Sequence, residues 1–240
     1  MFDLHLGDCI KAMSTFEPNS VDMVLADLPF GTTRQEWDQV LDLQKLWKQY
    51  QRIVKDNGAI VLFAKPPFDK ILAHSNIDNY RYDWVWEKTR ATGHLNARRM
   101  PMQAHENVCV FYAKQPLYIP QMSTGHKPMN NYYSSHLGEC YGKSSVMAGG
   151  GSTERFPRSV LKYPPVPNKD RLHPNQKPVA LLEFFIKTYT KEGDVVLDNT
   201  MGSGSTGEAC MNLKRRFVGV EKEPKYFNPA QARLSALQAA

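Results

Sequence analysis

The sequence lacks any long apolar stretch, and no run in its 240 residues approaches the length of about 18 residues that a membrane-spanning helix needs. It has only 4 cysteines, none of them in a Cys-x-x-Cys pair, which argues against a zinc site or a disulfide framework. The N-terminus carries an acid but no basic segment, unlike a secretory signal peptide. We therefore expect a cytoplasmic protein with no membrane partner and no bound metal.

Positive charge is concentrated in one part of the chain. The formal net charge is +6, but residues 81–178 hold 14 Lys or Arg against 6 Asp or Glu. A continuous basic segment suggests a surface that binds a polyanion, with nucleic acid as the first candidate. A solvated basic face without a partner is the alternative interpretation of the charge alone.

Short apolar runs alternate with amphipathic helical patterns along most of the chain. This alternation is typical of a doubly wound, Rossmann-like α/β fold. The predicted strands cover residues 4–6, 21–26, 59–63, 82–86, 108–112, 194–197 and 217–220. The predicted helices cover residues 10–16, 39–56, 67–75, 179–189, 208–213 and 224–237.

The composition changes between residues 115 and 172. Nine of the 16 prolines lie in residues 115–178, and a run of three glycines at 149–151 falls in the same stretch. Long segments of this kind inside a compact domain are usually functional or flexible. We expect residues 115–172 to be an inserted recognition element, partly flexible, between two halves of one domain at 1–114 and 173–240.

The predicted strand at residues 21–26 ends in the tetrapeptide Asp27-Leu28-Pro29-Phe30. In open α/β sheets, ligands bind at the carboxyl ends of the strands, where this tetrapeptide falls. An acid, a rigid turn with exposed carbonyl oxygens and a flat ring can together hold a planar group that carries an amine. A capping aspartate followed by a turn packed on the core is the competing interpretation.

A second candidate site lies near the C-terminus. Residues 194–197 form a predicted strand, Gly202 to Gly207 match the pattern G-x-G-x-x-G, and Glu221 ends the next predicted strand. This layout predicts a nucleoside-binding βαβ unit, and it also fits a dinucleotide-binding dehydrogenase. Asp198 precedes the first glycine by four residues, where its charge is unfavourable beside a pyrophosphate. The carboxylate favours a ligand with a cationic or amino end, such as S-adenosylmethionine.

Several motifs in register resemble those of the DNA amino-methyltransferases, which methylate adenine N6 or cytosine N4, in their circularly permuted arrangement. In that arrangement the catalytic motif comes first, a recognition region follows and the cofactor motif comes last. The matching segments are Gly7-Asp8, Asp27 to Phe30, Trp86-Glu87-Lys88, His105 to Val108, His173 to Pro178, Asp198 to Thr206 and Phe217 to Glu221. The departures from the family pattern are Leu28 for a proline, Phe30 for a tyrosine, and residues 199–201.

The resemblance implies an S-adenosylmethionine-dependent methyltransferase fold and a chemical role for the tetrapeptide. The side chain of Asp27 and the carbonyl of Leu28 would accept the two hydrogens of the target amine, at the turn that Pro29 makes rigid. Phe30 would stack on the base, which must leave the duplex to reach the site. The methyl group would then pass directly, in line, from the cofactor to the amine.

The resemblance also implies a set of cofactor-binding residues. Asp198 would bind the methionine amino end, Glu221 the ribose and Asp8 the adenine edge. Lys177 would lie near the methionine moiety. Structural alternatives are helix caps for Asp8 and Asp198, a solvated strand end for Glu221 and a surface position for Lys177. The complete set is Asp8, Cys9, Lys177, Asp198, Thr200, Gly202, Ser203, Gly204, Ser205, Thr206, Glu221 and Lys222.

Double-stranded DNA is the implied partner, bound by a monomer or a homodimer in the cytoplasm of a bacterial cell, or of the host cell if a phage encodes the protein. The candidate DNA contacts are Arg98, Arg99, Lys127, Lys143, Arg155 and Arg158. By resemblance, Asp27 at the start of the tetrapeptide favours adenine N6, because the enzymes specific for cytosine N4 often carry serine there. A catalytically weak DNA-binding protein that retains the fold is a further alternative, prompted by Leu28.

Overall fold

The computed structural model describes residues 1–32, 35, 38–132 and 148–239. These residues divide into two compact units. The larger unit comprises Met1–Ile119 and Ser159–Ala240, and the smaller unit comprises Pro120–Arg158. The candidate DNA contact Lys143 lies outside the described residues.

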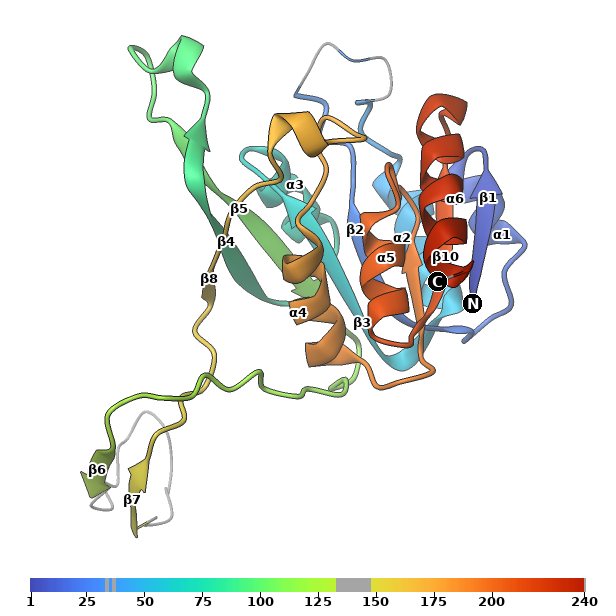
Figure 1. The fold of residues 1–240 in the computed structure, drawn as a ribbon. Coiled ribbons are helices and arrows are strands. Elements are labelled where there is room, and N and C mark those ends of the chain that lie inside the picture. The colour runs from blue at the N-terminus through green and yellow to red at the C-terminus, as the bar shows by residue number, and fades with distance from the viewer. Residues whose placement is uncertain (33–34, 36–37, 133–147, 240) are drawn as a thin grey trace. The chain divides into compact units, whose positions relative to one another are not determined.

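An eight-stranded mixed sheet runs through the larger unit (Figure 1). Its strand order is β1-β10-β9-β2-β3-β5-β4-β8. All neighbouring strands pair in parallel except β5, which is antiparallel to both β3 and β4. The strands are β1 Phe2–Leu6, β2 Val21–Asp27, β3 Val54–Ala64, β4 Tyr80–Thr92, β5 Gln103–Phe111, β8 Val160–Tyr163, β9 Val195–Asp198 and β10 Arg216–Glu221.

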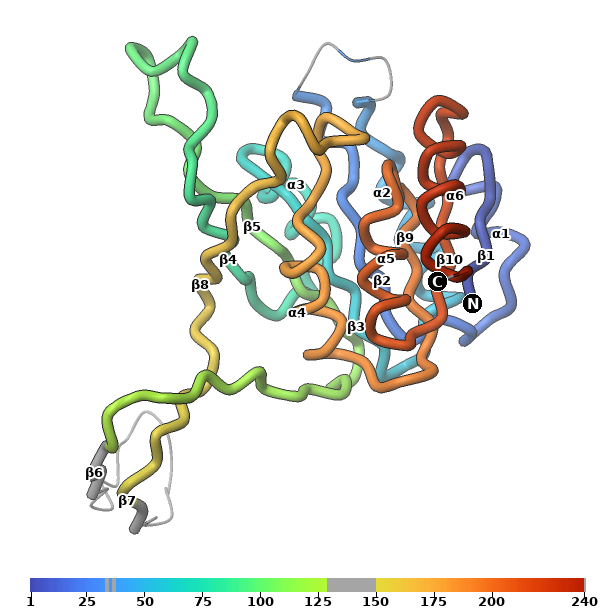
Figure 2. Tube along the Cα trace, in the orientation of Figure 1, coloured from blue at the N-terminus to red at the C-terminus, as the bar shows by residue number. Residues whose placement is uncertain are grey.

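Helices cover both faces of this sheet, so the predicted doubly wound α/β fold is confirmed (Figure 2). Side chains along β2 alternate between two cores, as the two-residue period of a strand requires. Met23 and Leu25 pack into the core beneath α4, α5 and α6, whereas Val24 and Ala26 pack into the core beneath α1, α2 and α3. The helices are α1 Cys9–Ser14, α2 Leu43–Ile53, α3 Phe68–Ser75, α4 Val179–Tyr189, α5 Ser205–Asn212 and α6 Pro224–Ala239.

Three adjacent strands end in carboxylates at the same edge of the sheet. β10, β9 and β2 are parallel neighbours, and their last residues are Glu221, Asp198 and Asp27. The carboxyl edge of an open α/β sheet is where such folds bind ligands. The topology therefore gathers residues that are widely separated in the sequence into one candidate site.

Strands β4 and β5 continue beyond the sheet as a two-stranded arm, which we define as residues 88–105. β3 pairs with β5 only as far as Asn107, while the β4–β5 pairing reaches Thr92 opposite Gln103. A short 3-10 turn, η1 His94–Asn96, lies at the end of the arm (Figure 1). Beyond Lys88, the last residue of β4 that pairs with β8, most residues of the arm are exposed.

The smaller unit contains an antiparallel pair, β6 Met129–Tyr132 and β7 Ala148–Ser152. It lies within the predicted insert 115–172 but is shorter, because β8 pairs with β4 and residues 159–172 thereby join the larger unit. A second 3-10 turn, η2 Asn168–Asp170, follows β8 in the larger unit. In the part of the chain that the structure describes, no helix combines the length and apolar character needed to cross a bilayer.

Candidate active site

A cavity of about 580 Å³ opens at the carboxyl ends of β2, β9 and β10. We call it cavity A. Its charged lining comprises five carboxylates, of Asp8, Asp27, Asp42, Asp198 and Glu221, and four lysines, Lys11, Lys45, Lys177 and Lys222. Its lining also includes all the predicted cofactor-binding residues except Gly204: Asp8, Cys9, Lys177, Asp198, Thr200, Gly202, Ser203, Ser205, Thr206, Glu221 and Lys222.

The turn between β9 and α5 forms one wall of cavity A. Gly202 has a φ of +52°, in the left-handed region that favours glycine, and its N–H donates to Glu221 Oε2 at 2.9 Å. The other oxygen of Glu221 accepts from the N–H of Glu223 at 2.8 Å. Burial raises the pKa of Glu221, although these backbone donors oppose the shift. Glu221 therefore holds the turn closed as well as facing the cavity.

Gly204 has a different role from the predicted one. Its φ is +73°, and a Cβ atom built on it would lie 3.1 Å from the Cβ of Ala230 in α6. Gly204 therefore allows α6 to pack closely on the turn and contributes nothing to the cavity wall. The glycine pattern in the sequence could not separate a packing glycine from a ligand-facing one.

Asp198 is buried at the end of β9 and tied into the same turn. Thr206 Oγ1 donates to its Oδ2 at 2.6 Å and the Thr200 N–H donates to its Oδ1 at 3.1 Å. Burial raises the pKa of Asp198 to about 7, against the effect of these donors. A cationic group in cavity A would favour the ionised form of this carboxylate.

Asp8 caps the next helix and also faces cavity A. Its Oδ1 accepts from the Lys11 N–H at 3.0 Å, so the capping interaction weighed from the sequence is present. The neighbouring Cys9 is buried, and burial raises the pKa of its thiol. The cap and the cavity position are compatible, because an N-cap carboxylate retains a second oxygen.

Asp27 and Thr200 connect the tetrapeptide to the turn after β9. Thr200 Oγ1 donates to the Asp27 carbonyl at 3.1 Å. The side chain of Leu28 is buried in the core beneath α2, so its backbone, and not its side chain, can contact a ligand in the cavity. Asp27, Leu28 and Pro29 line cavity A, whereas Phe30 lies outside it.

A second cavity of about 580 Å³, which we call cavity B, contains Phe30 in its wall. Cations dominate its charged lining: Lys65, Lys88, Arg90, Arg171 and Lys177 face a single carboxylate, Glu106. Asn175, Gln176 and Lys177 line both cavities and form the partition between them. The tetrapeptide thus contributes to two adjoining cavities, one with carboxylates and lysines in nearly equal number and the other with mostly cations.

Lys177 is buried between two carboxylates, contrary to the surface position weighed for it. Its ammonium donates to Asp27 Oδ2 and lies 3.4 Å from Glu106 Oε2. Burial alone would lower the pKa of Lys177, but Asp27 and Glu106 outweigh that effect and raise it. The lysine is therefore charged and belongs to the same site as the tetrapeptide.

Several site residues were missed in the sequence. The carboxylate of Asp38 accepts from the N–H groups of Phe30, Gly31 and Thr32 at 2.9, 2.9 and 3.0 Å, which fixes the turn after Pro29. Asn199 lines cavity A; its Oδ1 accepts from Tyr50 at 2.6 Å, and its side chain also interacts with the thiol of Cys9. An acid shortly after the tetrapeptide was the only available signal for Asp38.

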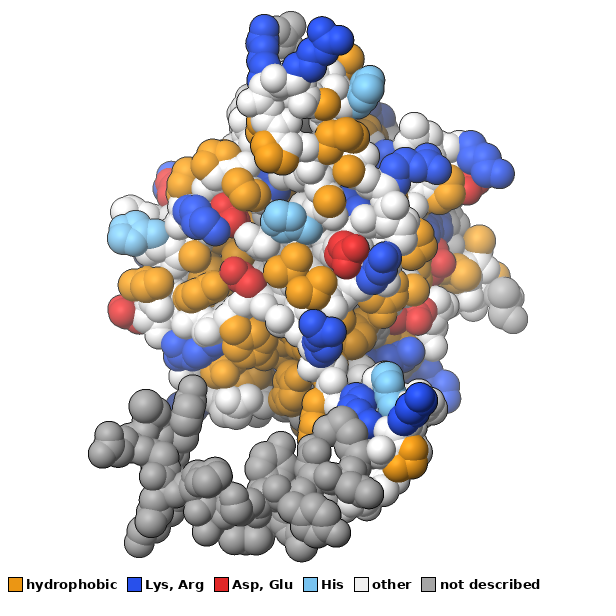
Figure 3. Space-filling model, turned by 90° about the vertical axis from the view of Figure 1, so that its left-hand side faces the viewer, with side chains coloured by type: hydrophobic (Ala, Val, Ile, Leu, Met, Phe, Trp, Pro, Cys, Tyr) orange, Lys and Arg blue, Asp and Glu red, His pale blue; other side chains and the backbone are white. Residues whose placement is uncertain are grey.

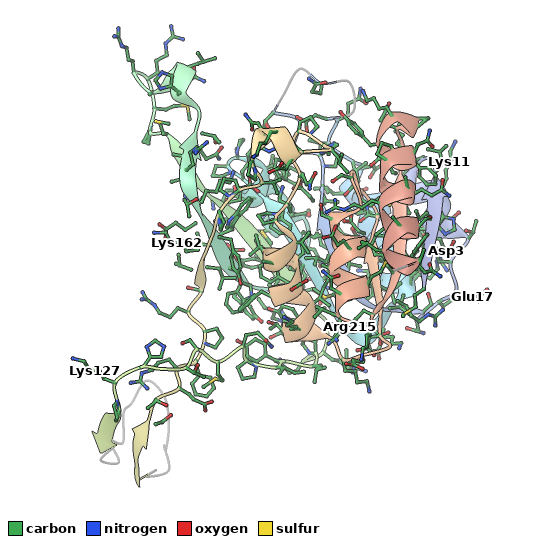
Figure 4. The ribbon with its side chains drawn as sticks, in the orientation of Figure 1. Asp3, Lys11, Glu17, Lys127, Lys162 and Arg215 are labelled. Carbon is green, nitrogen blue, oxygen red and sulfur yellow. The ribbon has the colours of Figure 1, made fainter. Side chains whose placement is uncertain are left out.

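The candidate DNA contacts fall in different places. Arg98 and Arg99 are exposed near the end of the β4–β5 arm, where Lys and Arg side chains gather beside hydrophobic ones (Figure 3). Lys127 and Arg158 are exposed in the smaller unit. Arg155 instead donates to the carbonyls of Ser152, Glu154 and Lys127, at 2.9, 2.7 and 2.5 Å. These hydrogen bonds link two segments of the smaller unit. Lys162 of β8 is a further exposed cation that points away from the sheet (Figure 4).

A cavity at the carboxyl edge of a doubly wound sheet, beside an Asp-Leu-Pro-Phe turn, is the ligand-binding arrangement of an open α/β protein. The model of the DNA methylase family that includes N6 and N4 methyltransferases matches residues 21–232, and the chain belongs to this family. The type II methyltransferase M.HinfI of Haemophilus influenzae is 27% identical over 268 residues, covering 97% of this chain and 68% of that protein. The type II methyltransferase M.HpaI of Haemophilus parainfluenzae is 27% identical over 248 residues, covering 97% and 74%.

Solved structures share the fold over nearly the whole chain. A complex of M1.HpyAVI with SAM is 24% identical, with a TM-score of 0.66, and covers 98% of this chain and 99% of that one. The PvuII DNA methyltransferase, described as cytosine-N4-specific, is 15% identical, with a TM-score of 0.67, covering 99% and 91%. These structures confirm the fold, and the family model confirms the predicted membership in the amino-methyltransferase family.

Proposed function

We propose that this DNA methyltransferase transfers a methyl group from S-adenosylmethionine to the exocyclic N6 of adenine in double-stranded DNA. The observation that carries the proposal is the position of the tetrapeptide: Asp27 faces the carboxylate-rich cavity A while Phe30 faces the cationic cavity B. A methyl donor and a nucleotide bound in these two cavities would meet at Asp27. On this proposal, residues 1–114 supply the catalytic half of the domain and residues 173–240 the cofactor-binding half.

Cavity A fits S-adenosylmethionine by charge and by its donors. Its five carboxylates suit the sulfonium and amino groups of this ligand, and its lysines suit the ligand's carboxylate. The buried Nδ2 of Asn199 lies in the wall of this cavity beside Cys9 and can also serve an acceptor of the cofactor. We assign Asp198 to the amino end, Glu221 to the ribose and Asp8 to the adenine edge.

When bound, S-adenosylmethionine supplies an electrophilic methyl group. The target amine is a poor nucleophile because its lone pair is delocalised into the base. Asp27 and the carbonyl of Leu28 would accept its two N–H groups and so favour lone-pair density on the nitrogen. The new N–C bond would form as the methyl–sulfur bond breaks and a neutral thioether leaves. The Asp27 carboxylate would stabilise the positive charge that develops on the amine, which would then lose one proton to solvent. Most of the catalysis is therefore positioning and electrostatics.

Cavity B would hold the target base after it leaves the duplex. Phe30 presents a ring for stacking, and the surrounding Lys and Arg side chains suit the phosphates on either side of a flipped nucleotide. Arg98 and Arg99 on the β4–β5 arm, whose stem residues Arg90 and Thr92 line cavity B, would extend this contact along the DNA. We propose Lys127, Lys143 and Arg158 as further contacts, made by a monomer or a homodimer in the cytoplasm.

The test is to incubate the protein with labelled S-adenosylmethionine and unmethylated DNA and to identify the methylated nucleoside. N6-methyladenine is expected, because Asp27 starts the tetrapeptide. N4-methylcytosine alone would overturn the choice of adenine and leave the methyltransferase assignment intact. Sequencing the methylome of a host that expresses the protein would then give the target sequence.

A catalytically weak DNA-binding protein is the second candidate, and Leu28 in place of the family's proline is the observation that favours it. It predicts DNA binding without methyl transfer to any nucleoside. The same labelling experiment separates the two proposals, because a single turnover detected in excess enzyme would exclude this candidate.

A further inference from the structure

Four charged side chains from four segments of the fold form a continuous buried chain of alternating sign. Lys88 of β4 donates to Glu106 Oε1 of β5 at 2.5 Å. Glu106 Oε2 faces Lys177, which precedes α4 and donates to Asp27 at the end of β2. Their side chains are between 7% and 19% exposed. A buried ion chain of this length is costly to desolvate, so it calls for a function beyond stability.

The series of ion pairs ends at Asp27, the carboxylate that the proposed reaction uses to accept the target amine. Asp27 Oδ2 accepts a hydrogen bond from the Lys177 ammonium. Asp27 Oδ1 is buried and has no hydrogen-bond donor among the described residues. One oxygen is thus fixed and the other is left to accept an N–H group. The Lys177 ammonium also lies 6.0 Å from the centre of the Phe30 ring, which places it beside the second group assigned to the base.

We propose, building on the proposed function, that Lys177 is a positioning residue: held by Glu106 and Lys88, it fixes Asp27 through Oδ2 so that Oδ1 accepts the amine of the target base. Lys177 acts through Asp27 and makes no contact with the transferred methyl group. This differs from the role near the methionine moiety of the cofactor that the family resemblance suggested. The two roles predict different defects in variants.

The charges around Asp27 make opposite contributions to its ionisation. The pKa of Asp27 is raised to about 6, and burial is the largest cause. Lys177 and Lys88 oppose this rise, and Glu106 adds to it. Asp198, at the end of the neighbouring strand, is the other carboxylate that interacts with Asp27. Ionised Asp27 accepts an N–H group more strongly than the neutral acid and stabilises the positive charge that develops on the amine, so activity falls as the pH drops through the pKa of Asp27. Removing Lys177 should therefore move the acidic limb of the pH profile upward, and neutralising Glu106 should move it downward.

The experiment measures kcat from pH 5 to pH 9 with tritiated S-adenosylmethionine and unmethylated plasmid DNA, for Lys177→Met, Glu106→Gln and the double variant. For Lys177→Met we expect the acidic limb to rise by about one pH unit or more, as on loss of an opposite charge within about 4–6 Å. Glu106→Gln should lower the limb, and the double variant should fall between the two. Lys114→Met is the matched control, because it removes an exposed Lys–Asp pair outside both cavities and should leave the profile unchanged.

The dissociation constant of S-adenosylmethionine is the second readout. Unshifted limbs, or limbs that move in the same direction, would overturn the proposal and leave Lys177 a structural residue. A cofactor affinity weakened about tenfold in Lys177→Met with an unshifted limb would give Lys177 the cofactor role instead. If Lys177→Met fails to fold by circular dichroism, the downward shift in the near-isosteric Glu106→Gln decides the matter. A wild-type protein that methylates no DNA would refute the proposed function itself. An active wild-type protein whose variants show no shift in the pH profile would refute only this inference.

Discussion

Cavities A and B have similar volumes and share a partition, yet they differ in charge and in what lines them. Cavity A is built from strand ends and a glycine turn, and five carboxylates and four lysines line it. Cavity B is built from the stem of the β4–β5 arm, the proline-rich segment after β8 and an aromatic ring, and five cations face it. The first lining suits a cationic cofactor and the second a base with its phosphates.

The difference shows how one sheet forms two adjoining cavities with different charged linings. The parallel strands deliver backbone turns and acids at their carboxyl ends, as the topology of open α/β sheets dictates. The antiparallel strand β5 and its neighbour β4 run past that edge, so their side chains form a wall beyond the sheet. Asp27 and Lys177 lie where the two constructions meet, and variants there should have the largest effects.

Asp27→Asn should have the largest effect, because it removes the charge that faces the developing ammonium. We expect kcat to fall by about 10²- to 10³-fold, the usual cost of one lost electrostatic stabiliser. Cofactor affinity should change little, since the carboxylates of Asp198 and Glu221 remain. Single-turnover methylation and cofactor titration measure the two effects. The matched control is Asp3→Asn, an exposed carboxylate of β1 (Figure 4), and a control as inactive as Asp27→Asn would contradict the assignment.

Most of the fold could be predicted from the sequence, and the reasons are local. Residues 23–26 of β2 are apolar on both faces of the strand, because helices cover both faces of the sheet and bury all four side chains. Helix α2 is shorter than the predicted 39–56, because Asp42 caps its start and Val54 already belongs to β3. The arm could not be predicted, because the pairing of Thr92 with Gln103 depends on register between strands and not on any local pattern.

The cofactor wall was also accessible from the sequence, since Asp198, Gly202 and Glu221 follow a spacing set by one βαβ unit. The partition was not. Lys177 and Glu106 are distant in the sequence, and only the packing of α4's leading segment against β5 brings their charges within 3.4 Å. Asp38 was missed for a related reason, since an acid in a loop gives no sign that three backbone N–H groups will turn toward it.

Phe30→Ala should have the second-largest effect and should be confined to cavity B. The loss of base stacking costs about 1–3 kcal/mol, which corresponds to about 5- to 100-fold in kcat/KM for DNA. Cofactor affinity should be unchanged, because Phe30 does not line cavity A. Phe30→Tyr should retain activity and Phe30→Leu should not, although both keep contact with Phe68, whose ring centre lies 5.5 Å away. Equal activity of the Tyr and Leu variants would show that packing, and not stacking, is the function of this ring.

The pH dependence of cofactor binding should show a smaller effect that is confined to cavity A. Asp198 has a pKa of about 7, and it must be ionised to pair with an amino group. Affinity for S-adenosylmethionine should therefore weaken as the pH falls below about 7, by up to about tenfold per pH unit. Asp198→Asn should bind weakly at every pH and lose this dependence, whereas the exposed Glu17→Gln (Figure 4) should keep it. Calorimetric titration from pH 5.5 to pH 8.5 checks the slope, and a slope that persists in Asp198→Asn would assign the titration to another group.

Arg98→Ala and Arg99→Ala should have the smallest effects and should leave both cavities intact. Each exposed arginine on the β4–β5 arm contacts phosphate in our proposal, so each substitution should weaken DNA binding a few-fold and reduce the dependence of log Kd on log salt by about 1. Cofactor affinity and single-turnover kcat at saturating DNA should stay constant. Lys191→Ala is the control, because this exposed lysine lies beside the amino end of β9, at the edge of the sheet opposite the cavities. Fluorescence anisotropy with duplex DNA at several salt concentrations gives both quantities. A salt slope unchanged in both arginine variants and in their combination would remove the arm from the DNA interface and leave cavity B as the only cationic surface of the larger unit assigned to the nucleic acid.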